Sequence, residues 1–287
     1  MSHVEPIPGE PAAVGSIDGD RTLFVADYHA GIEAALRYER GVQVPSQAED
    51  RRERLCALLD QTDADRLVVL GDLMHSIGDP GGAERGEIEV LFESLPPIPV
   101  TLVKGNHDGA IESWLQEVID DASRGRPGSA TGATELTVLD GDGGRLGAIG
   151  VCHGHSWPTT TAIEADVLCF GHEHPCVRLE DEVGGSRVES VWFRGELDRA
   201  KLGPGGPAAQ DDDDATDGAD HVDTDTGSVT PSDGLEFVVF PAFNELAGGT
   251  WINVEGQSFL SPMLPDGLRT GEAYLLDGTR LGPYESI

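Results

Sequence analysis

The chain has 287 residues, enough for one large domain or two small ones with a substantial core. Acidic residues outnumber basic ones 52 to 19, giving a formal charge of -33, which disfavours passive binding to nucleic acid or an anionic membrane through a broad basic face. Because the acidic residues are spread along the chain, the composition predicts a soluble, halophilic protein adapted to high salt, with an ordinary acidic cytosolic protein as the alternative.

The sequence also predicts where the protein works. No segment approaches the roughly 20 apolar residues that span a bilayer. The N-terminus, MSHVEPIPGEPAAVGS, lacks the basic start and apolar core of a signal peptide. The four cysteines form no C-x-x-C pair, and three of them lie in or beside apolar runs, where a buried, reduced thiol is expected. We therefore expect a cytoplasmic protein without a membrane partner.

The first half of the chain alternates strands with helices. Residues 1–20 are rich in proline and glycine and are predicted to be a loose tail. Short apolar strands follow at Arg21–Asp27, Arg66–Asp72 and Pro99–Asn106. Helical spacing of apolar residues occurs in GIEAALRYERG, in the run that contains Leu55, Leu58 and Leu59, in GEIEVLFESL and in AIESWLQEV. This alternation predicts an α/β core with its site at the carboxyl ends of the strands.

The second half has short strands, glycine-rich turns and little helix. ELTVLD, RLGAIGVCH, DVLCFGH, CVRLED and SRVESVWFRG predict a second, more antiparallel sheet packed on the first. The segment 203–234 has nine aspartates and no lysine, arginine or aromatic residue, so it is predicted to be a disordered surface loop. LEFVVFPAFNELAGGTWINV then resumes the strand pattern. We therefore expect one domain over 21–287, interrupted by an acidic insertion.

Polar residues gather in five short blocks, each after a predicted strand. The blocks are Asp27-Tyr28-His29, Gly71-Asp72, Gly105-Asn106-His107-Asp108, His153-Gly154-His155 and Gly171-His172-Glu173-His174. Seven of the nine histidines lie in or next to these blocks. Carboxylates, imidazoles and one amide oxygen suit a divalent ion of intermediate hardness, such as manganese, iron or zinc. So many ligands are enough for two ions, which can clamp the attacking and leaving oxygens of a displacement at phosphorus.

The five blocks, in this order, resemble the calcineurin-like metallophosphoesterase family, whose pattern is D-x-H, G-D, G-N-H-[DE], H and G-H-x-H. The resemblance covers about Arg21 to Glu182. It implies a four-layer αββα sandwich, with two packed mixed sheets flanked by helices, around a dinuclear metal site. VADYHAGIE, GDLMHS, KGNHDG, HGHSWP, GHEHP and PAFNELAGG are similar to a subgroup of small prokaryotic and archaeal phosphoesterases that includes the DNA-ligase-associated ones.

The resemblance also implies a role for each polar residue. The implied metal ligands are Asp27, His29 and His174 for the first ion, Asn106, His153 and His172 for the second, and Asp72 as the bridge between them. A hydroxide held between the ions would attack phosphorus. His107 would protonate the leaving oxygen or stabilise the transition state. Manganese is the expected metal, with iron or zinc as alternatives.

One position departs from the family pattern. Many members carry an acidic residue three positions after the bridging aspartate, where it orients the catalytic histidine, but this chain has His75 there. The group that orients His107 is therefore left open between Asp108 and a backbone carbonyl. We assign His75 to a substrate-facing role and His155 to contact with a substrate phosphate, and a structural role is the alternative for each.

These features predict a two-metal hydrolase of phosphoesters, with diesters of nucleotides or nucleic-acid ends as the preferred substrates, although a fold alone does not fix a substrate. One alternative is a phosphomonoesterase that uses the same site. Another is a non-catalytic scaffold of the same fold in a DNA-processing complex, which would bind a protein partner. A metal that only staples the fold is disfavoured, because structural sites are closed and this one is open.

Overall fold

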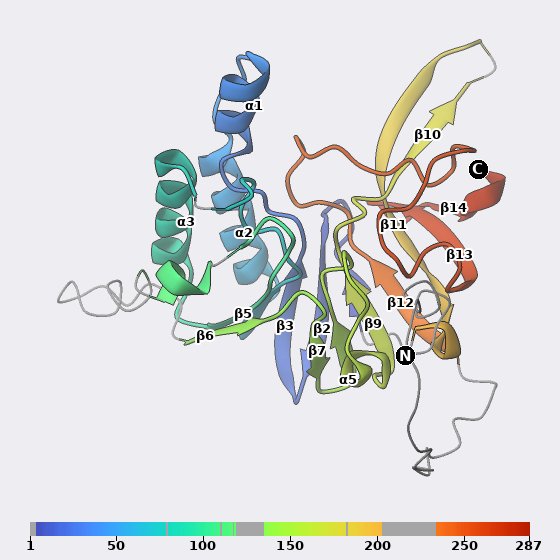
Figure 1. Cartoon of the computed structure of the whole chain (residues 1–287), viewed down its shortest axis with the longest axis horizontal. Coiled ribbons are helices and arrows are strands. Elements are labelled where there is room, and N and C mark those ends of the chain that lie inside the picture. The colour runs from blue at the N-terminus through green and yellow to red at the C-terminus, as the bar shows by residue number, and fades with distance from the viewer. Residues whose placement is uncertain are drawn as a thin grey trace, which may run out of the picture.

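The strands of the protein form two sheets that pack face to face, as the computed structural model shows (Figure 1). The structure describes residues 4–78, 80–109, 111–116, 118, 135–181, 183–202 and 234–287. Helices lie outside the sheets. This arrangement confirms the predicted sandwich of two mixed sheets flanked by helices.

The first sheet has six strands in the order β1-β2-β3-β4-β5-β6. Its strands are β1 (Val4–Pro6), β2 (Ala12–Ile17), β3 (Asp20–Val25), β4 (Arg66–Val69), β5 (Pro99–Val103) and β6 (Glu135–Leu139). The strands from β3 to β6 run parallel, and β1 and β2 extend the sheet antiparallel at one edge. The assignment of ELTVLD to the second sheet is therefore wrong, because β6 pairs in parallel with β5 at the edge of the first sheet.

Helices cover the outer face of this sheet. They are α1 (Ile32–Arg40), α2 (Ala48–Gln61) and α3 (Gly82–Ser94), and residues 112–116 are also helical. Leucine side chains of α2 and α3 pack in one buried cluster with side chains of β3 and β4. The helix α1 begins after Gly31 and ends at Gly41, which has the left-handed conformation that commonly ends a helix. Among the described helices, none combines the length and apolar character that a bilayer span requires.

The second sheet has eight strands, with β10 attached to β11 beside the path β14-β13-β11-β12-β9-β8-β7. Its strands are β7 (Gly144–Leu146), β8 (Ile149–Val151), β9 (Val167–Phe170), β10 (Cys176–Glu180), β11 (Ser186–Asp198), β12 (Gly234–Val239), β13 (Leu268–Leu275) and β14 (Arg280–Pro283). Only β8, β9 and β12 pair in parallel among these strands. The short helices α5 (Thr160–Ile163), η1 (Arg199–Lys201) and η3 (Tyr284–Ser286) accompany this sheet, so its helical layer is thin.

A buried cluster between the sheets holds the sandwich together. Phe24 of β3 and Leu70 after β4 contribute to it from one side, and Trp192 of β11 from the other. The Trp192 ring meets that of Phe240 edge to face, with 4.9 Å between centroids. Because β3 and β4 are buried on both faces, they read as continuous apolar runs rather than as alternating ones.

The N-terminal segment corrects the prediction of a loose tail over residues 1–20. β1 and β2 form an antiparallel pair that continues into β3, and Val4, Ala13 and Ile17 are buried between the sheets. The proline and glycine residues mark turns and an edge strand instead of a flexible tail. Asp18 and Gly19 both have positive φ, 52° and 100°, as a tight hairpin between β2 and β3 requires.

The predicted acidic insertion at 203–234 lies outside the described residues except for Gly234. Asp198 of β11 pairs with Gly234 of β12, so the strands that precede and follow the segment are neighbours in the second sheet. The division of the chain into one domain with an insertion stays a prediction.

Candidate metal centre

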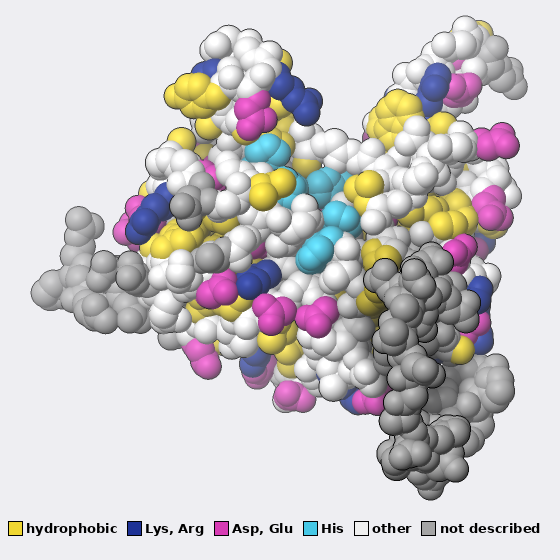
Figure 2. Space-filling model, in the orientation of Figure 1, with side chains coloured by type: hydrophobic (Ala, Val, Ile, Leu, Met, Phe, Trp, Pro, Cys, Tyr) yellow, Lys and Arg dark blue, Asp and Glu magenta, His cyan; other side chains and the backbone are white. Residues whose placement is uncertain are grey.

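The polar blocks meet at one edge of the sandwich. Each block begins within two residues of the end of a strand, namely β3, β4, β5, β8 or β9. These strands are among the parallel ones of both sheets, and ligands bind beyond the carboxyl ends of parallel strands. Figure 2 shows the histidines together in a hollow between two projecting parts of the surface.

Two groups of side chains there have the spacing of metal ligands. Asp27, His29 and His174 form one group, and Asp72, His153 and His172 form the other, with the candidate ligand atoms of each group within 4.8 Å of one another. In the first group, His174 Nε2 lies 3.2 Å from Asp27 Oδ1 and 3.4 Å from His29 Nε2.

The second group includes the predicted amide ligand. His153 Nε2 lies 3.5 Å from Asp72 Oδ2 and 3.1 Å from Asn106 Oδ1. The ring of His172 lies close by, with its centroid 5.0 Å from that of His153. The structure thus places all seven predicted ligands around two neighbouring positions.

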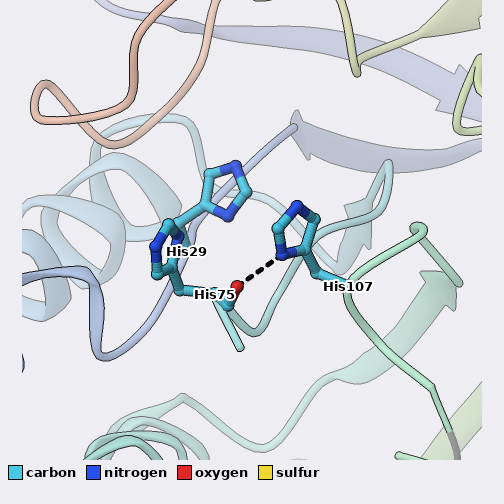
Figure 3. A group of neighbouring side chains, drawn as sticks. All are labelled: His29, His75 and His107. Carbon is cyan, nitrogen blue, oxygen red and sulfur yellow. Dashed lines mark hydrogen bonds between the residues drawn. The ribbon is translucent and has the colours of Figure 1, made fainter. Parts of the chain in front are cut away.

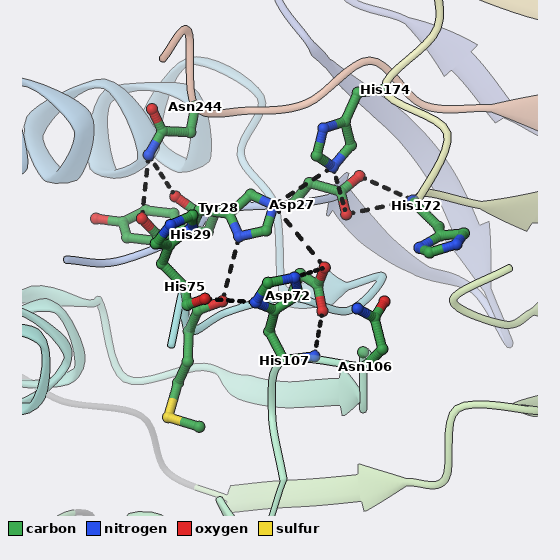
Figure 4. A network of polar contacts seen from close by, with 12 residues as sticks. Asp27, Tyr28, His29, Asp72, His75, Asn106, His107, His172, His174 and Asn244 are labelled. Carbon is green, nitrogen blue, oxygen red and sulfur yellow. Dashed lines mark hydrogen bonds and ion pairs between the residues drawn. The ribbon is translucent and has the colours of Figure 1, made fainter. Parts of the chain in front are cut away.

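Asp72 lies between the two groups (Figure 4). Its Oδ2 is 3.8 Å from His29 Nε2 on one side and 3.5 Å from His153 Nε2 on the other. Its Oδ1 accepts a hydrogen bond of 2.9 Å from the backbone N–H of His107. This placement is the one that a bridging carboxylate needs.

Backbone carbonyls fix the orientation of three of the imidazole rings. The Nδ1 atoms of His29, His153 and His174 lie 3.3, 2.9 and 2.6 Å from the carbonyl oxygens of Met74, Leu70 and Gly248, respectively. A neutral imidazole that donates from Nδ1 has its Nε2 lone pair free for a metal. Since these Nε2 atoms converge with the carboxylates, the donor set fits a pair of divalent ions.

The ligand loops have a strained backbone. Asp27, His29, Asp72, His172 and His174 all have φ between 42° and 66°. Residues other than glycine adopt this left-handed region at a cost of roughly 1–3 kcal/mol each, and such residues cluster at functional sites. The strain therefore marks these loops as held in place by the surrounding structure.

Two glycines allow the blocks to approach one another. A Cβ atom at Gly71 would lie 2.1 Å from His153 Nδ1, and one at Gly105 would lie 1.9 Å from Asp72 Oδ1. Both distances are far below van der Waals contact, so the second group can form only with glycine at these positions.

Burial and charge set the protonation of the ligands. Burial lowers the pKa of His29 to about 4, and burial together with the charge of His153 lowers the pKa of His172 to about 4. Burial also disfavours the charged form of His153, but the carboxylates of Asp72 and Asp27 raise its pKa to about 9. Without metal, a proton on His153 therefore balances the buried carboxylates, and a bound cation would replace it.

The structure identifies the group that orients His107. Its Nδ1 contacts the backbone carbonyl oxygen of His75, so the ring is held by a carbonyl and not by Asp108 (Figure 3). Its Nε2 lies 3.9 Å from Asp72 Oδ2, at the border of the two ligand groups. A third group with the spacing of metal ligands consists of His29, His75 and His107. His29 has a single free Nε2, so it cannot bind one ion with this group and another ion with Asp27 and His174.

His75 and His155 lie next to the ligands. The His75 ring stacks on that of His107, with 5.7 Å between centroids and 19° between planes. The His155 ring lies 5.3 Å from that of His153. The Nδ1 atom of each is buried without a hydrogen-bond partner among the described residues. Their roles toward substrate stay predictions.

An open cavity of about 540 Å³ leads to these residues, and we call it the metal cavity. One wall is the face of α1 that carries Ile32, Leu36 and Arg40, and the opposite wall lies within residues 246–260. His75 and His107 line the cavity together with five of the seven predicted ligands, namely His29, Asp72, Asn106, His172 and His174. A substrate can therefore reach both the ligand groups and His107 from solvent.

Two buried residues outside the predicted set support the ligand loops. Asn244 donates from Nδ2 to the carbonyl oxygens of Tyr28 and His29, at 3.0 and 3.1 Å. Glu173 accepts hydrogen bonds from the backbone of Leu260 and Ser261, at 2.8 and 2.6 Å. Asn244 lies in the PAFNELAGG segment and Glu173 between two ligands, but sequence spacing alone gives no sign of these contacts.

Asp108 braces two of the loops. Its Oδ1 accepts a hydrogen bond of 2.9 Å from Met74 N–H, and its Oδ2 accepts one of 2.8 Å from Gly105 N–H. The carboxyl group is fully buried, and burial, reinforced by the charge of Asp72, raises its pKa to about 6. Asp108 thus positions the loops that carry His75 and His107.

Replacing Asp108 by asparagine is expected to lower the free energy of unfolding by about 1–3 kcal/mol, because one buried N–H then faces an NH₂ group. The measurement is the urea midpoint at unchanged m value. Glu112→Gln is the control, since that carboxylate is half exposed and its pairing with Lys104 contributes at most about 1 kcal/mol. Equal midpoints for the two variants would contradict the bracing role.

The chain was compared with known proteins in three ways. No protein with a curated record matches the chain. A solved structure, described as the crystal structure of Pseudomonas putida nuclease MPE, aligns with 97% of this chain and 100% of that chain, with 19% sequence identity and a TM-score of 0.48. The model of the calcineurin-like phosphoesterase family matches residues 20–176, which is more than half of the chain. That match spans the positions of all seven predicted ligands, and it shows that the chain belongs to the calcineurin-like phosphoesterase family, a family of metal-dependent phosphoester hydrolases.

Proposed function

We propose that the protein hydrolyses phosphodiesters of nucleotides or of nucleic-acid ends with two divalent ions, most readily manganese. The observation that carries the proposal is the position of Asp72 between two groups of ligands at the floor of an open cavity. A site that only stabilised a fold would be closed by its four ligands. Iron and zinc are the alternative metals, since the imidazole and carboxylate ligands suit them as well.

In this proposal, each of the two groups of side chains would hold one ion. Asp27, His29 and His174 would hold one ion, and the other ion would be held by Asn106, His153 and His172, with Asp72 shared. Bound there, the ions would supply Lewis-acid stabilisation of the charge that develops on the phosphoryl oxygens.

The chain itself supplies a proton donor. The carbonyl oxygen of His75 contacts Nδ1 of His107, and this contact leaves Nε2 facing the metal cavity. A protonated Nε2 would give its proton to the leaving oxygen, as a general acid does. His75, stacked on His107, and His155, beside the second group, would contact the substrate phosphate.

The charges of the metal cavity favour a diester over a monoester. Arg40 is the one arginine or lysine among the described residues that line it, and the carboxylate of Glu39 lies beside it. A cavity with so little positive charge of its own suits the single charge of a diester better than the double charge of a monoester. Phosphomonoester hydrolysis at the same site is the second candidate, and intact ligand groups disfavour a non-catalytic scaffold.

The charge and the cysteines of the chain support the proposal that it works at high salt in the cytoplasm. The formal charge of -33 supports work at high salt, and the buried thiols of Cys152 and Cys169, whose pKa values burial raises, support a reducing cytoplasm. A protein partner in DNA processing stays a prediction from the resemblance alone.

The test is reconstitution of the metal-free protein in concentrated salt. Chelation should remove two ions per chain and abolish hydrolysis of an aryl phosphodiester, and manganese should restore it. A panel of monoesters, cyclic nucleotides and DNA ends then ranks the substrates by kcat/KM, with diesters expected first. Full activity of the metal-stripped protein would refute the two-metal proposal, and preference for monoesters would select the second candidate.

A further inference from the structure

A second cavity adjoins the metal cavity. It measures about 550 Å³, close to the about 540 Å³ of the metal cavity. Gln257 and Ser258 line both cavities, so these two residues form the ridge between them. The remaining lining comes from residues 252–259 and from Leu264, Pro265, Tyr284 and Glu285. A substrate bound at the ligands can therefore extend across the ridge.

The lining of the second cavity disfavours a phosphate group. Among its described lining residues there is no lysine or arginine, and it has two carboxylates, Glu255 and Glu285. The positive lining residue of the neighbouring metal cavity, Arg40, lies on α1. With two carboxylates and no positive side chain in its described lining, the second cavity repels an anionic part of the substrate.

The same lining suits a neutral aromatic group with a polar edge. Phe259 and Tyr284 offer partly exposed rings, which meet at 72° with 5.9 Å between centroids. Gln257 is exposed, and its side-chain amide has no hydrogen-bond partner in the described part of the chain. An aromatic surface with one free amide and nearby carboxylates can stack on a nucleobase and bond its edge.

The wall between the cavities is fixed to the metal ligands. Glu173, which stands between His172 and His174, holds the backbone of Leu260 and Ser261 through Oε1. The side-chain amide of Asn253 accepts a hydrogen bond from the backbone N–H of Arg178 and donates one to the carbonyl oxygen of the same residue. The second cavity is therefore held at a constant position relative to the ligands, as a specific subsite requires.

From this geometry we infer that the second cavity is a subsite for the neutral nucleoside of the substrate, the ester group that does not leave. This inference rests on the proposed function. His107, the proposed proton donor, belongs to a loop of the first sheet, so the leaving oxygen lies on that side. The other ester group then extends toward Gln257 and Ser258, in the segment that follows β12 of the second sheet.

The test compares two diesters with the same leaving group and the same charge, thymidine 5′-(p-nitrophenyl phosphate) and methyl p-nitrophenyl phosphate. The nucleoside ester should have a kcat/KM at least about tenfold higher, since stacking of one base typically contributes a factor of this size. Gln257→Ala should reduce that ratio, while Gln61→Ala, at the exposed end of α2, should leave it unchanged.

A charge test uses the same substrate with an added 3′-phosphate on the thymidine. Its kcat/KM should fall below that of the unmodified nucleoside ester at low salt, because Glu255 and Glu285 repel the phosphate. Glu255→Gln should recover part of the loss. An added phosphate that raises kcat/KM would show that the nucleoside binds elsewhere.

A binding measurement separates this inference from the proposed function. Free thymidine should bind the metal-free protein in equilibrium dialysis, and Gln257→Ala should weaken that binding. If neither diester is hydrolysed but thymidine binds in this way, the proposed function fails and the subsite stands. If both esters react with equal kcat/KM and thymidine does not bind, the subsite is refuted and the proposed function stands.

Discussion

Replacing Asp72 by asparagine is expected to leave the protein with at most one tightly bound ion and to reduce kcat/KM by more than about 100-fold. Loss of an outer partner of a ligand already costs about 10–100-fold in metal affinity or activity, and Asp72 lies against both ligand groups. Asparagine has the same shape and keeps an oxygen for the His107 N–H, so the fold should survive. Only the charge between the two cations is removed.

The measurement is metal content by elemental analysis beside kinetics on an aryl diester. Asp50→Asn is the control, because Asp50 is an exposed carboxylate on α2, away from the ligands. Retention of two ions with unchanged kinetics in Asp72→Asn would mean that another group joins the two positions.

His107→Ala is expected to keep both ions and to lower kcat by roughly 10²–10⁴-fold, the range that general acid catalysis contributes. His107 contacts Asp72 through its backbone N–H, which alanine retains, and its ring is not among the seven predicted ligands. The loss should fall mainly on kcat, since a proton given in the transition state contributes little to substrate binding.

Paired aryl diesters with good and poor leaving groups separate the two roles that remain for His107. A general acid matters less when the leaving oxygen is a weak base, so the loss should be smaller for the better leaving group. An equal loss for both esters would instead assign His107 to stabilising the transition state without proton transfer. Loss of metal, as in Asp72→Asn, would make His107 a ligand.

The clustering of the predicted ligands could be foreseen from sequence because each of their blocks follows closely after an apolar strand. Asp27 and Asp72, for example, each follow a short apolar run, so the local sequence shows both where the strand ends and that a carboxylate stands there. Parallel strands then bring these carboxyl ends to one edge of the sheet. The hairpin of β2 and β3 is also predictable from sequence, since Asp18-Gly19 is a hairpin turn signal.

Other features depend on contacts between distant segments and leave no local pattern. The support of His107 is a backbone carbonyl, which any residue in place of His75 would supply. From sequence, Asp108 is a candidate for orienting the ring of His107. Its carboxylate instead accepts hydrogen bonds from the backbone N–H groups of Met74 and Gly105. The second cavity combines residues 252–265 with Tyr284 and Glu285, and only the folded chain brings them together.

At the predicted metal ligands with positive φ, stability and activity favour different residues. Asp27, His29, Asp72, His172 and His174 together store strain of the same order as the about 5–15 kcal/mol net stability of a whole domain. Glycine at any of these positions would relieve the strain and remove a ligand. Selection for robustness alone would therefore favour loss of these residues, and only selection for activity at this edge would keep them.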